Sequence, residues 1–338
     1  MPPPEEIIQV TGLCHSYGTA KAVDGISFSV KRGEIFSFLG PNGAGKSTVI
    51  NILITLLNLQ KSTASVAGYD VAREPQKVRE AIGIVFQTVT LDRDMTVWES
   101  LEFHGRLYNM PKGERRKRIE ELLQLVQLDL KRDERTRNLS GGMKRRLEIA
   151  RGLMTRPEVL FLDEPTIGLD PQTRIRMWQY IRQVNREGTT VFLTTHYMEE
   201  ADHLSDRISI IDNGKIVVTG TTWALKNNLG RDIIYLETDK NEEAIRLLRN
   251  LPQTTEIKEK TRGFNLVVNM DGTKVLPDVI DTLRGRGIEI ATINLTKPTM
   301  DDVFVFYTGK EFRDEPSTRT LEIPDTPVTK EPPLPVGE

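Results

Sequence analysis

Short apolar runs alternate with longer amphipathic segments along the first two thirds of the chain. Five such runs, each bounded by turn-forming residues, occupy positions 35–39, 82–86, 159–162, 190–193 and 207–211. Runs of this length are typical of strands that are buried on both faces of a largely parallel sheet. Helical patterns lie between them, beginning with residues 48–57 after the first run. The pattern therefore predicts an α/β core.

Residues 91–155 have a different character, because helix formers and charged residues dominate there. Apolar residues recur at helical spacing within this stretch, at Ile119, Leu122, Leu123 and Val126. We interpret the stretch as a helical subdomain inserted into the α/β core.

The pattern restarts on a smaller scale after residue 222. Strand-like segments at 233–238, 254–259, 264–268 and 288–295 enclose helical segments at 242–250 and 274–284. The order βαββαβ predicts a small ferredoxin-like α+β module. We therefore expect a core domain over 6–222, an accessory module over 223–310 and a Pro-rich tail over 311–338. The tail is expected to be disordered, as a solvating end or as a docking peptide.

Composition narrows the possible classes of protein. The 338 residues carry 46 Lys and Arg against 48 Asp and Glu, so the formal net charge is −2 and no nucleic-acid partner is expected. A single cysteine, Cys14, excludes an internal disulfide and fits a reducing compartment. No apolar run reaches the roughly 18 residues of a membrane span, and no signal peptide follows Met1. We expect a cytoplasmic protein whose membrane role, if any, requires a partner.

The strongest chemical signal directly follows the first apolar run and has the pattern G-x-x-x-x-G-K-S. Its glycines let backbone N–H groups close around an anion, and the following helix N-terminus adds positive potential. Lys46 can reach the β- and γ-phosphates of a nucleotide, and Ser47 can ligate Mg²⁺. The residues expected to surround the phosphates are Gly40, Pro41, Asn42, Gly43, Ala44, Gly45, Lys46, Ser47 and Thr48.

Two carboxylates follow the apolar run at 159–162. Asp163 and Glu164 come at the carboxyl end of a predicted strand, where ligands gather in open α/β sheets. We expect Asp163 to hold Mg²⁺ and Glu164 to orient or deprotonate the attacking water. Such a run could also be a strand that meets a polar turn, but the phosphate loop at 40–47 favours the metal-site interpretation.

A third motif lies between these two. Ser140 is placed as the N-cap of a helix and is followed by Gly141 and Gly142, which makes a second anion-binding helix terminus. In this order the motifs resemble the nucleotide-binding subunit of ATP-binding-cassette (ABC) transporters, whose signature is Leu-Ser-Gly-Gly-Gln. Met143 stands where that signature has glutamine. The resemblance covers about residues 7–225 and implies a P-loop NTPase core.

The resemblance also implies cofactors, partners and residue roles. Two copies would sandwich two MgATP, with Ser140, Gly141 and Gly142 of one copy closing over the nucleotide of the other. Lys46, Gln87, Glu164 and His196 would be catalytic, and Ser47, Gln87 and Asp163 would hold Mg²⁺. Tyr17 would stack on adenine, Asp170 would meet the opposite subunit, and His196 would contact the γ-phosphate. Taken singly, a Tyr, Gln or His is more often structural or merely exposed, and only the order and spacing of the set favour these roles.

The end of the chain indicates a subgroup. Residues 297–304, Lys-Pro-Thr-Met-Asp-Asp-Val-Phe, resemble the C-terminal motif of ATPases from daunorubicin-resistance-type exporters. The resemblance implies a separate membrane permease, export, and a peripheral position on the cytoplasmic face of the cell membrane. The simpler alternative is an amphipathic helix that packs on its own small domain.

Two other functions remain open at this point. One is a soluble ABC ATPase of DNA repair, translation or cluster assembly. The sequence lacks the long heptad coiled coil, the second phosphate loop and the zinc-binding cysteines found in such relatives, and a cluster-assembly ATPase would lack the module after residue 222. A regulator that binds ATP without hydrolysing it would not need Glu164.

Overall fold

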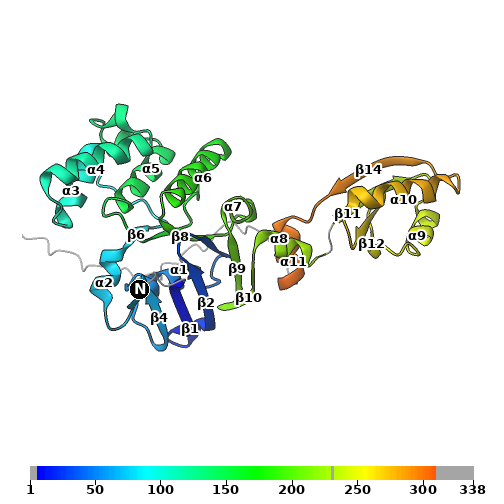
Figure 1. Ribbon diagram of the computed structural model, residues 1–338, viewed down its shortest axis with the longest axis horizontal. Coiled ribbons are helices and arrows are strands. Elements are labelled where there is room, and N and C mark those ends of the chain that lie inside the picture. Colours follow the sequence, from blue (N-terminus) through cyan, green and yellow to red (C-terminus); the bar gives the residue numbers. More distant parts are fainter. Residues whose placement is uncertain (1–5, 230–231, 310–338) are drawn as a thin grey trace, which may run out of the picture.

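The protein is described here by a computed structural model, which defines residues 6–229 and 232–309. Figure 1 shows a large α/β body and, set apart from it, a smaller unit made of the later residues. The predicted tail, residues 311–338, lies outside the described residues.

A six-stranded sheet with the order β10-β9-β3-β8-β7-β6 runs through the body. Strand β10 (Lys215–Gly220) is antiparallel to its neighbour, and the other five strands are parallel. The five apolar runs form these parallel strands, so the strand prediction is confirmed with small differences at the strand ends. The strands are β3 (Ile35–Leu39), β6 (Ile82–Val85), β7 (Val159–Asp163), β8 (Thr190–Thr195) and β9 (Arg207–Asp212).

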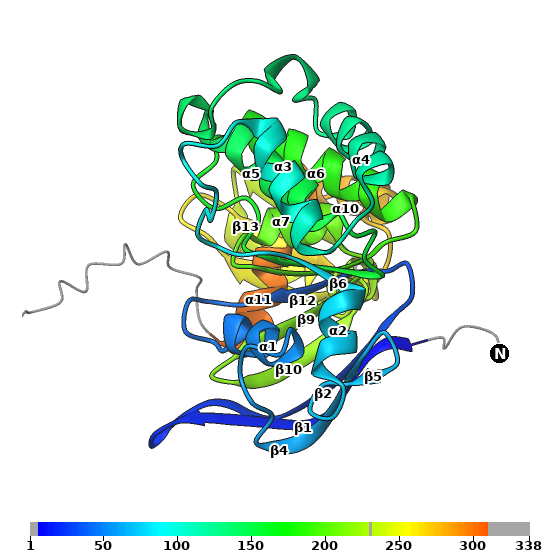
Figure 2. The same ribbon diagram turned by 90° about the vertical axis from the view of Figure 1, so that its left-hand side faces the viewer.

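Alternate residues of the central strands pack on opposite faces of this sheet. In β7, Leu160 and Leu162 pack toward α3 (Val97–Leu107), α4 (Lys112–Leu125), α5 (Gly141–Gly152) and α6 (Pro171–Arg186). Val159 and Phe161 pack on the other face, toward α1 (Lys46–Leu53) and α2 (Pro75–Ala81). Figure 2 shows the two helical layers above and below the sheet. The helices α3 to α5 fall within the predicted helical stretch 91–155.

A second, antiparallel sheet packs against α1, on the side of the central sheet where α1 lies. Its order is β2-β1-β4-β5, and it consists of β1 (Glu6–Tyr17), β2 (Ala20–Lys31), β4 (Lys61–Val66) and β5 (Tyr69–Asp70). The apolar residues of this sheet form one core cluster with α1 and the central strands.

The helix after the phosphate loop ends earlier than predicted. The sequence pattern extends over 48–57, whereas α1 ends at Leu53. Thr55 has φ +67°, and the N–H groups of Leu56 and Leu57 both donate to the carbonyl of Asn51. A β-branched residue at positive φ is uncommon. No glycine or proline marks this end of the helix in the sequence, so the pattern could not predict it.

The smaller unit has the predicted βαββαβ order and the sheet order β12-β13-β11-β14, with every neighbouring pair antiparallel. Its two helices pack against the strands in a core of their own. The ferredoxin-like prediction is therefore confirmed. The elements are β11 (Asp232–Thr238), α9 (Asn241–Leu248), β12 (Thr254–Glu259), β13 (Phe264–Val268), α10 (Gly272–Arg284) and β14 (Ile290–Thr296).

The last helix, α11 (Met300–Thr308), returns to the body. Its residues Met300, Val303 and Phe304 are buried in one cluster with residues of β9, α7 (Met198–Leu204) and α8 (Thr222–Asn227). The alternative that this helix packs on its own small domain is therefore wrong. The chain leaves the body after α8 and rejoins it at α11, so the smaller unit is attached at both ends.

This packing predicts a stability effect at Phe304. The side chain of Phe304 is 2% exposed, so Phe304→Ala is expected to lower the stability of the body by about 3–5 kcal/mol. Phe306 lies on the same helix but is 62% exposed, and Phe306→Ala should change stability little. Urea unfolding followed by tryptophan fluorescence compares the two. Equal midpoints for both variants would contradict a structural role for α11.

Candidate active site

The candidate site lies where neighbouring parallel strands end. The phosphate loop follows β3, Asp163 ends β7 and Glu164 follows it, and His196 follows β8. Because β3, β8 and β7 are adjacent and parallel, their carboxyl ends meet at one edge of the sheet. This edge is where open α/β sheets bind their ligands.

Lys46 is held inside the phosphate loop. It is 4% exposed, and its Nζ donates to the carbonyls of Gly40 at 2.7 Å and Pro41 at 3.1 Å. Burial lowers the pKa of Lys46, and the charge of Glu164, whose Oε1 lies 3.3 Å away, opposes that shift. At Gly45 φ is +101°, and a Cβ there would lie 2.5 Å from the carbonyl oxygen of Ala22. The loop therefore needs glycine, and its curled backbone with a buried ammonium fits a phosphate group.

Asp163 and Ser47 form a small cluster of oxygen atoms. The hydroxyl of Ser47 donates to Oδ1 of Asp163 at 3.2 Å, and the hydroxyl of Thr194 donates to the same oxygen. A hydroxyl beside a carboxylate is the kind of oxygen donor set that suits Mg²⁺. Thr194 is not among the predicted site residues, although a polar residue in a fully buried strand is a signal for such a role.

Glu164 and His196 meet directly, with Oε2 of the carboxylate 2.9 Å from Nδ1 of the imidazole. Burial raises the pKa of Glu164, but the hydrogen bond from His196 and the charge of Lys46 outweigh it, so the pKa lies below its usual value. Glu164 has φ +47° and its N–H donates to the carbonyl of Thr194 at 3.1 Å. The side chain of Glu164 is thus ionised, and its backbone has a strained conformation that the neighbouring residues hold in place.

The Ser-Gly-Gly motif has the predicted cap. Ser140 is the N-cap of α5, and its hydroxyl accepts a hydrogen bond from the N–H of Met143 at 3.3 Å. A Cβ on Gly142 would lie 2.4 Å from Cγ2 of Thr173, so this glycine allows α5 to approach α6. Asp170 is the N-cap of α6 and accepts from the N–H of Thr173 at 3.0 Å.

The structure brings only part of the predicted set together. Lys46, Ser47, Asp163, Glu164 and His196 are joined by the contacts above. The motif on α5 belongs to the helical layer opposite α1, so it is separated from its own phosphate loop by the sheet (Figures 1 and 2). Tyr17, which is 52% exposed at the end of β1, and the exposed Gln87 after β6 take no part in those contacts.

A buried ion pair on α5 was not anticipated. Arg145 and Glu148 are 4% and 0% exposed, and NH1 of Arg145 lies 3.1 Å from Oε2 of Glu148. Opposite charges three residues apart on a predicted helix are the only sequence signal for it.

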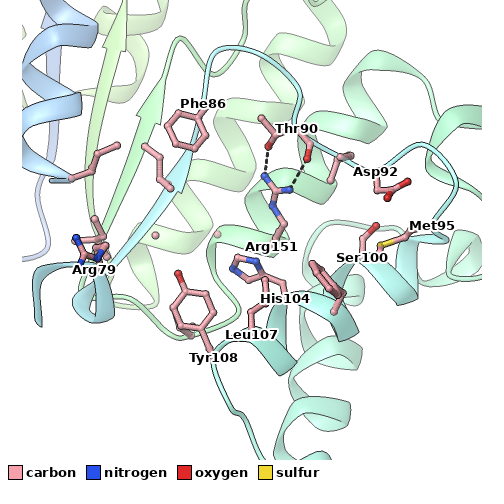
Figure 3. A pocket seen from close by; sticks show the side chains of 18 of the residues that line it. Arg79, Phe86, Thr90, Asp92, Met95, Ser100, His104, Leu107, Tyr108 and Arg151 are labelled. Atoms are coloured by element: carbon pink, nitrogen blue, oxygen red, sulfur yellow. Dashed lines mark hydrogen bonds between the residues drawn. The ribbon is translucent and has the colours of Figure 1, made fainter. Parts of the chain in front are cut away.

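A cavity of about 540 Å³ opens beside the end of β6. Figure 3 shows its side chains, which come from β6 and the segment after it, from α3 and from the end of α5. Phe103 and Leu107 on its wall are 51% and 61% exposed, and Arg79 and Arg151 add positive charge. We call this cavity the groove.

A phosphate loop, paired carboxylates, a histidine beside them and a separate capped glycine motif define a P-loop NTPase of the ABC type. Two family models match the chain: one described as ABC transporter over residues 23–167, and one described as the C-terminal domain of ATP-binding protein DrrA1-3-like over residues 220–308.

Individual relatives agree with these matches. The chain is 40% identical to the daunorubicin resistance ATP-binding protein DrrA3 of Streptomyces coeruleorubidus, over 90% of this chain and 97% of that protein. It is 36% identical to the linearmycin resistance ATP-binding protein LnrL of Bacillus subtilis, over 91% of this chain and 100% of that protein. The dimeric ATP-binding cassette MJ0796, bound to ADP and Pi after hydrolysis, matches with a TM-score of 0.57 and 28% identity over 63% of this chain and 98% of that chain.

The chain belongs to the ATP-binding subunits of ABC transporters, in the daunorubicin-resistance group. It is an ATP-binding and ATP-hydrolysing subunit, and proteins of its family dimerise and work with a membrane permease. None of the helices within 6–229 and 232–309 is both long enough and apolar enough to cross a bilayer.

Proposed function

We propose that two copies of this chain bind two MgATP between them, hydrolyse them and drive export through a separate permease. The observation that carries this proposal is the contact cluster of Lys46, Asp163, Glu164 and His196 at one edge of the sheet. The relatives are resistance proteins for daunorubicin and linearmycin, which favours a drug, a lipid or another amphipathic compound as the exported substrate.

Phosphate binding is assigned to the loop and the start of α1. The backbone N–H groups of residues 40–48 and the ammonium of Lys46 would surround the β- and γ-phosphates, and Tyr17, exposed at the end of β1, would stack on adenine. The incoming phosphates compete with Glu164 for Lys46, because the two side chains now lie 3.3 Å apart. We expect nucleotide binding to release one oxygen of the carboxylate toward water.

Ser47, Asp163 and Gln87 would hold Mg²⁺. The ion would neutralise charge on the phosphate oxygens during transfer. Thr194 keeps Asp163 in place by donating to the same oxygen as Ser47.

Glu164 would orient the attacking water and accept its proton. Its lowered pKa keeps it ionised near neutral pH, which is the form required of a base. His196 holds the other carboxylate oxygen and would contact the γ-phosphate.

The second half of each site would come from the partner copy. The core of α5 packs on the opposite face of the sheet from α1 in one chain, which supports a role for Ser140, Gly141 and Gly142 at the nucleotide of the other chain. Their capped helix end supplies N–H donors and positive potential, and Asp170 on the neighbouring α6 would meet the opposite subunit.

We assign the contact with the permease to the groove. It adjoins Gln87 through Phe86, and its exposed apolar wall together with Arg79 and Arg151 suits an amphipathic segment of the permease. This contact would place the subunit on the cytoplasmic face of the cell membrane without a membrane span of its own.

Phosphate release by the purified chain tests the hydrolysis, and a substitution in the groove tests the partner. Phe103→Asp puts a charge on the apolar wall and should abolish co-purification with the permease while phosphate release by the isolated subunit stays within about twofold of wild type. Leu130→Asp is the control, because Leu130 is 94% exposed and lies outside the groove. Undiminished co-purification of Phe103→Asp would contradict the assigned contact.

A further inference from the structure

Arg145 binds the backbone of Glu164, the proposed catalytic base, and of the residues on either side of it. Its NH2 donates to the carbonyls of Asp163 at 3.0 Å and Glu164 at 3.1 Å, and its Nε donates to the carbonyl of Pro165 at 2.8 Å. Its NH1 donates to the carbonyl of Phe86, the residue before Gln87. One buried side chain on α5 thus holds the ends of β7 and β6.

This arrangement needs a guanidinium. Three of the four bound carbonyls are in succession, and the middle one belongs to Glu164, whose φ is +47°. A strained residue persists only where its surroundings over-determine it. The planar fork of arginine offers five donors in fixed directions, whereas a lysine ammonium is a compact point charge on a flexible stem.

The partner of Arg145 connects this backbone to the groove. Glu148 faces Arg145 with Oε2, and its Oε1 accepts from the N–H of Thr90 at 2.8 Å. The carbonyl of Thr90 in turn accepts from Arg151 at 3.0 Å. Figure 3 shows Thr90 and Arg151 joined by two hydrogen bonds in the wall of the groove.

We propose that Arg145 is the positioning residue for Glu164, and that its ion pair with Glu148 transmits displacements of Thr90 in the groove wall to that carboxylate. Both residues of the pair are buried, so water cannot replace a lost partner of either charge. A displacement of one side chain is therefore expected to displace the other. The proposal rests on the role given to Glu164 above.

The first test is Arg145→Lys in the full chain. The fork is lost and the positive charge is kept, so kcat should fall about tenfold or more, since small misplacements in an active site cost up to about 10²-fold. The KM for MgATP should change less than about threefold, because Arg145 does not contact the phosphate loop in any of these bonds. Arg146→Lys is the matched control: Arg146 donates to the carbonyl of Val126 and the hydroxyl of Tyr180, away from Glu164.

The second test combines substitutions. If Arg145 acts through Glu164, Arg145→Lys should change the residual rate of Glu164→Gln by less than about twofold. A further tenfold loss in the double variant would overturn the inference while leaving the role of Glu164 intact. A Glu164→Gln variant that hydrolyses ATP at the wild-type rate would instead overturn the proposed function.

Glu148→Gln provides a test should Arg145→Lys fail to fold. It keeps an acceptor for Thr90 but removes the charge that faces Arg145, so kcat should fall about threefold, and not at all in the Glu164→Gln background. In the assembled transporter, the ratio of ATPase rates with and without permease should also fall for Glu148→Gln and not for Arg146→Lys. Wild-type kcat in folded Glu148→Gln, or an unchanged ratio, would overturn the proposal.

Discussion

Glu164→Gln should slow ATP hydrolysis by about 10²–10⁴-fold, the usual range for loss of a general base, while ATP still binds. In the proposed mechanism, binding rests on the phosphate loop and Asp163, which the substitution leaves intact. Glutamine keeps the shape of the side chain and an acceptor for His196, but it cannot take a proton from water. Phosphate release measures turnover, and a fluorescent nucleotide measures affinity.

The stalled variant should accumulate as an ATP-bound dimer, which size-exclusion chromatography with MgATP detects. Glu158→Gln is a suitable control, because Glu158 pairs with Arg32 at the surface, away from the site. Equal steady-state phosphate release by Glu164→Gln and wild type would remove Glu164 from the mechanism.

Two inactive variants should restore activity when they are mixed, if each site joins the phosphate loop of one chain to the Ser-Gly-Gly motif of the other. Lys46→Ala damages the site that contains its own phosphate loop, whereas Ser140→Arg damages the site of its partner. Each homodimer then has two defective sites. In the mixed dimer, the phosphate loop of the Ser140→Arg chain meets the intact motif of the Lys46→Ala chain, so one site is whole.

Phosphate release against mixing ratio should pass through a maximum at intermediate ratios. Differently tagged chains establish that subunits have exchanged. A confirmed mixed dimer that stays inactive would count against independent composite sites. Ser140→Arg that is active on its own, near the wild-type rate, would rule out the role given to the signature motif.

The sequence predicts the parts of this structure that rest on local pattern. The central strands are apolar runs because both faces of the sheet are covered. The phosphate loop is recognisable because its glycines and Lys46 are the residues that phosphate binding requires. The end of α1 at Leu53 was not predictable, since Thr55 adopts a positive φ that neither its own type nor its neighbours favour.

Features that depend on distant contacts were not predictable either. Met300, Val303 and Phe304 show an apolar face, but nothing in the pattern says that the face belongs on β9 and α7. Arg145 and Glu148 look like the solvated side of a charged helix. Only the folded chain places Arg145 among the carbonyls that follow β7 and β6, and Glu148 against Arg145 and the N–H of Thr90. The roles of the predicted site residues, with Tyr17 and Gln87 among them, remain predictions.

The double attachment of the small unit makes it an insertion in a continuous body, not an appendage at its end. A truncation at residue 223 would remove α8 and α11 from Ile208 and Ile210 and expose an apolar surface. The phenotype of such a protein would therefore reflect damage to the body and not the function of the small unit. The two connections lie close together, because Lys226, Asn227, Lys297 and Pro298 line one cavity. An internal deletion that joins the end of α8 to the start of α11 would remove the unit and leave the apolar surface of the body covered by both helices.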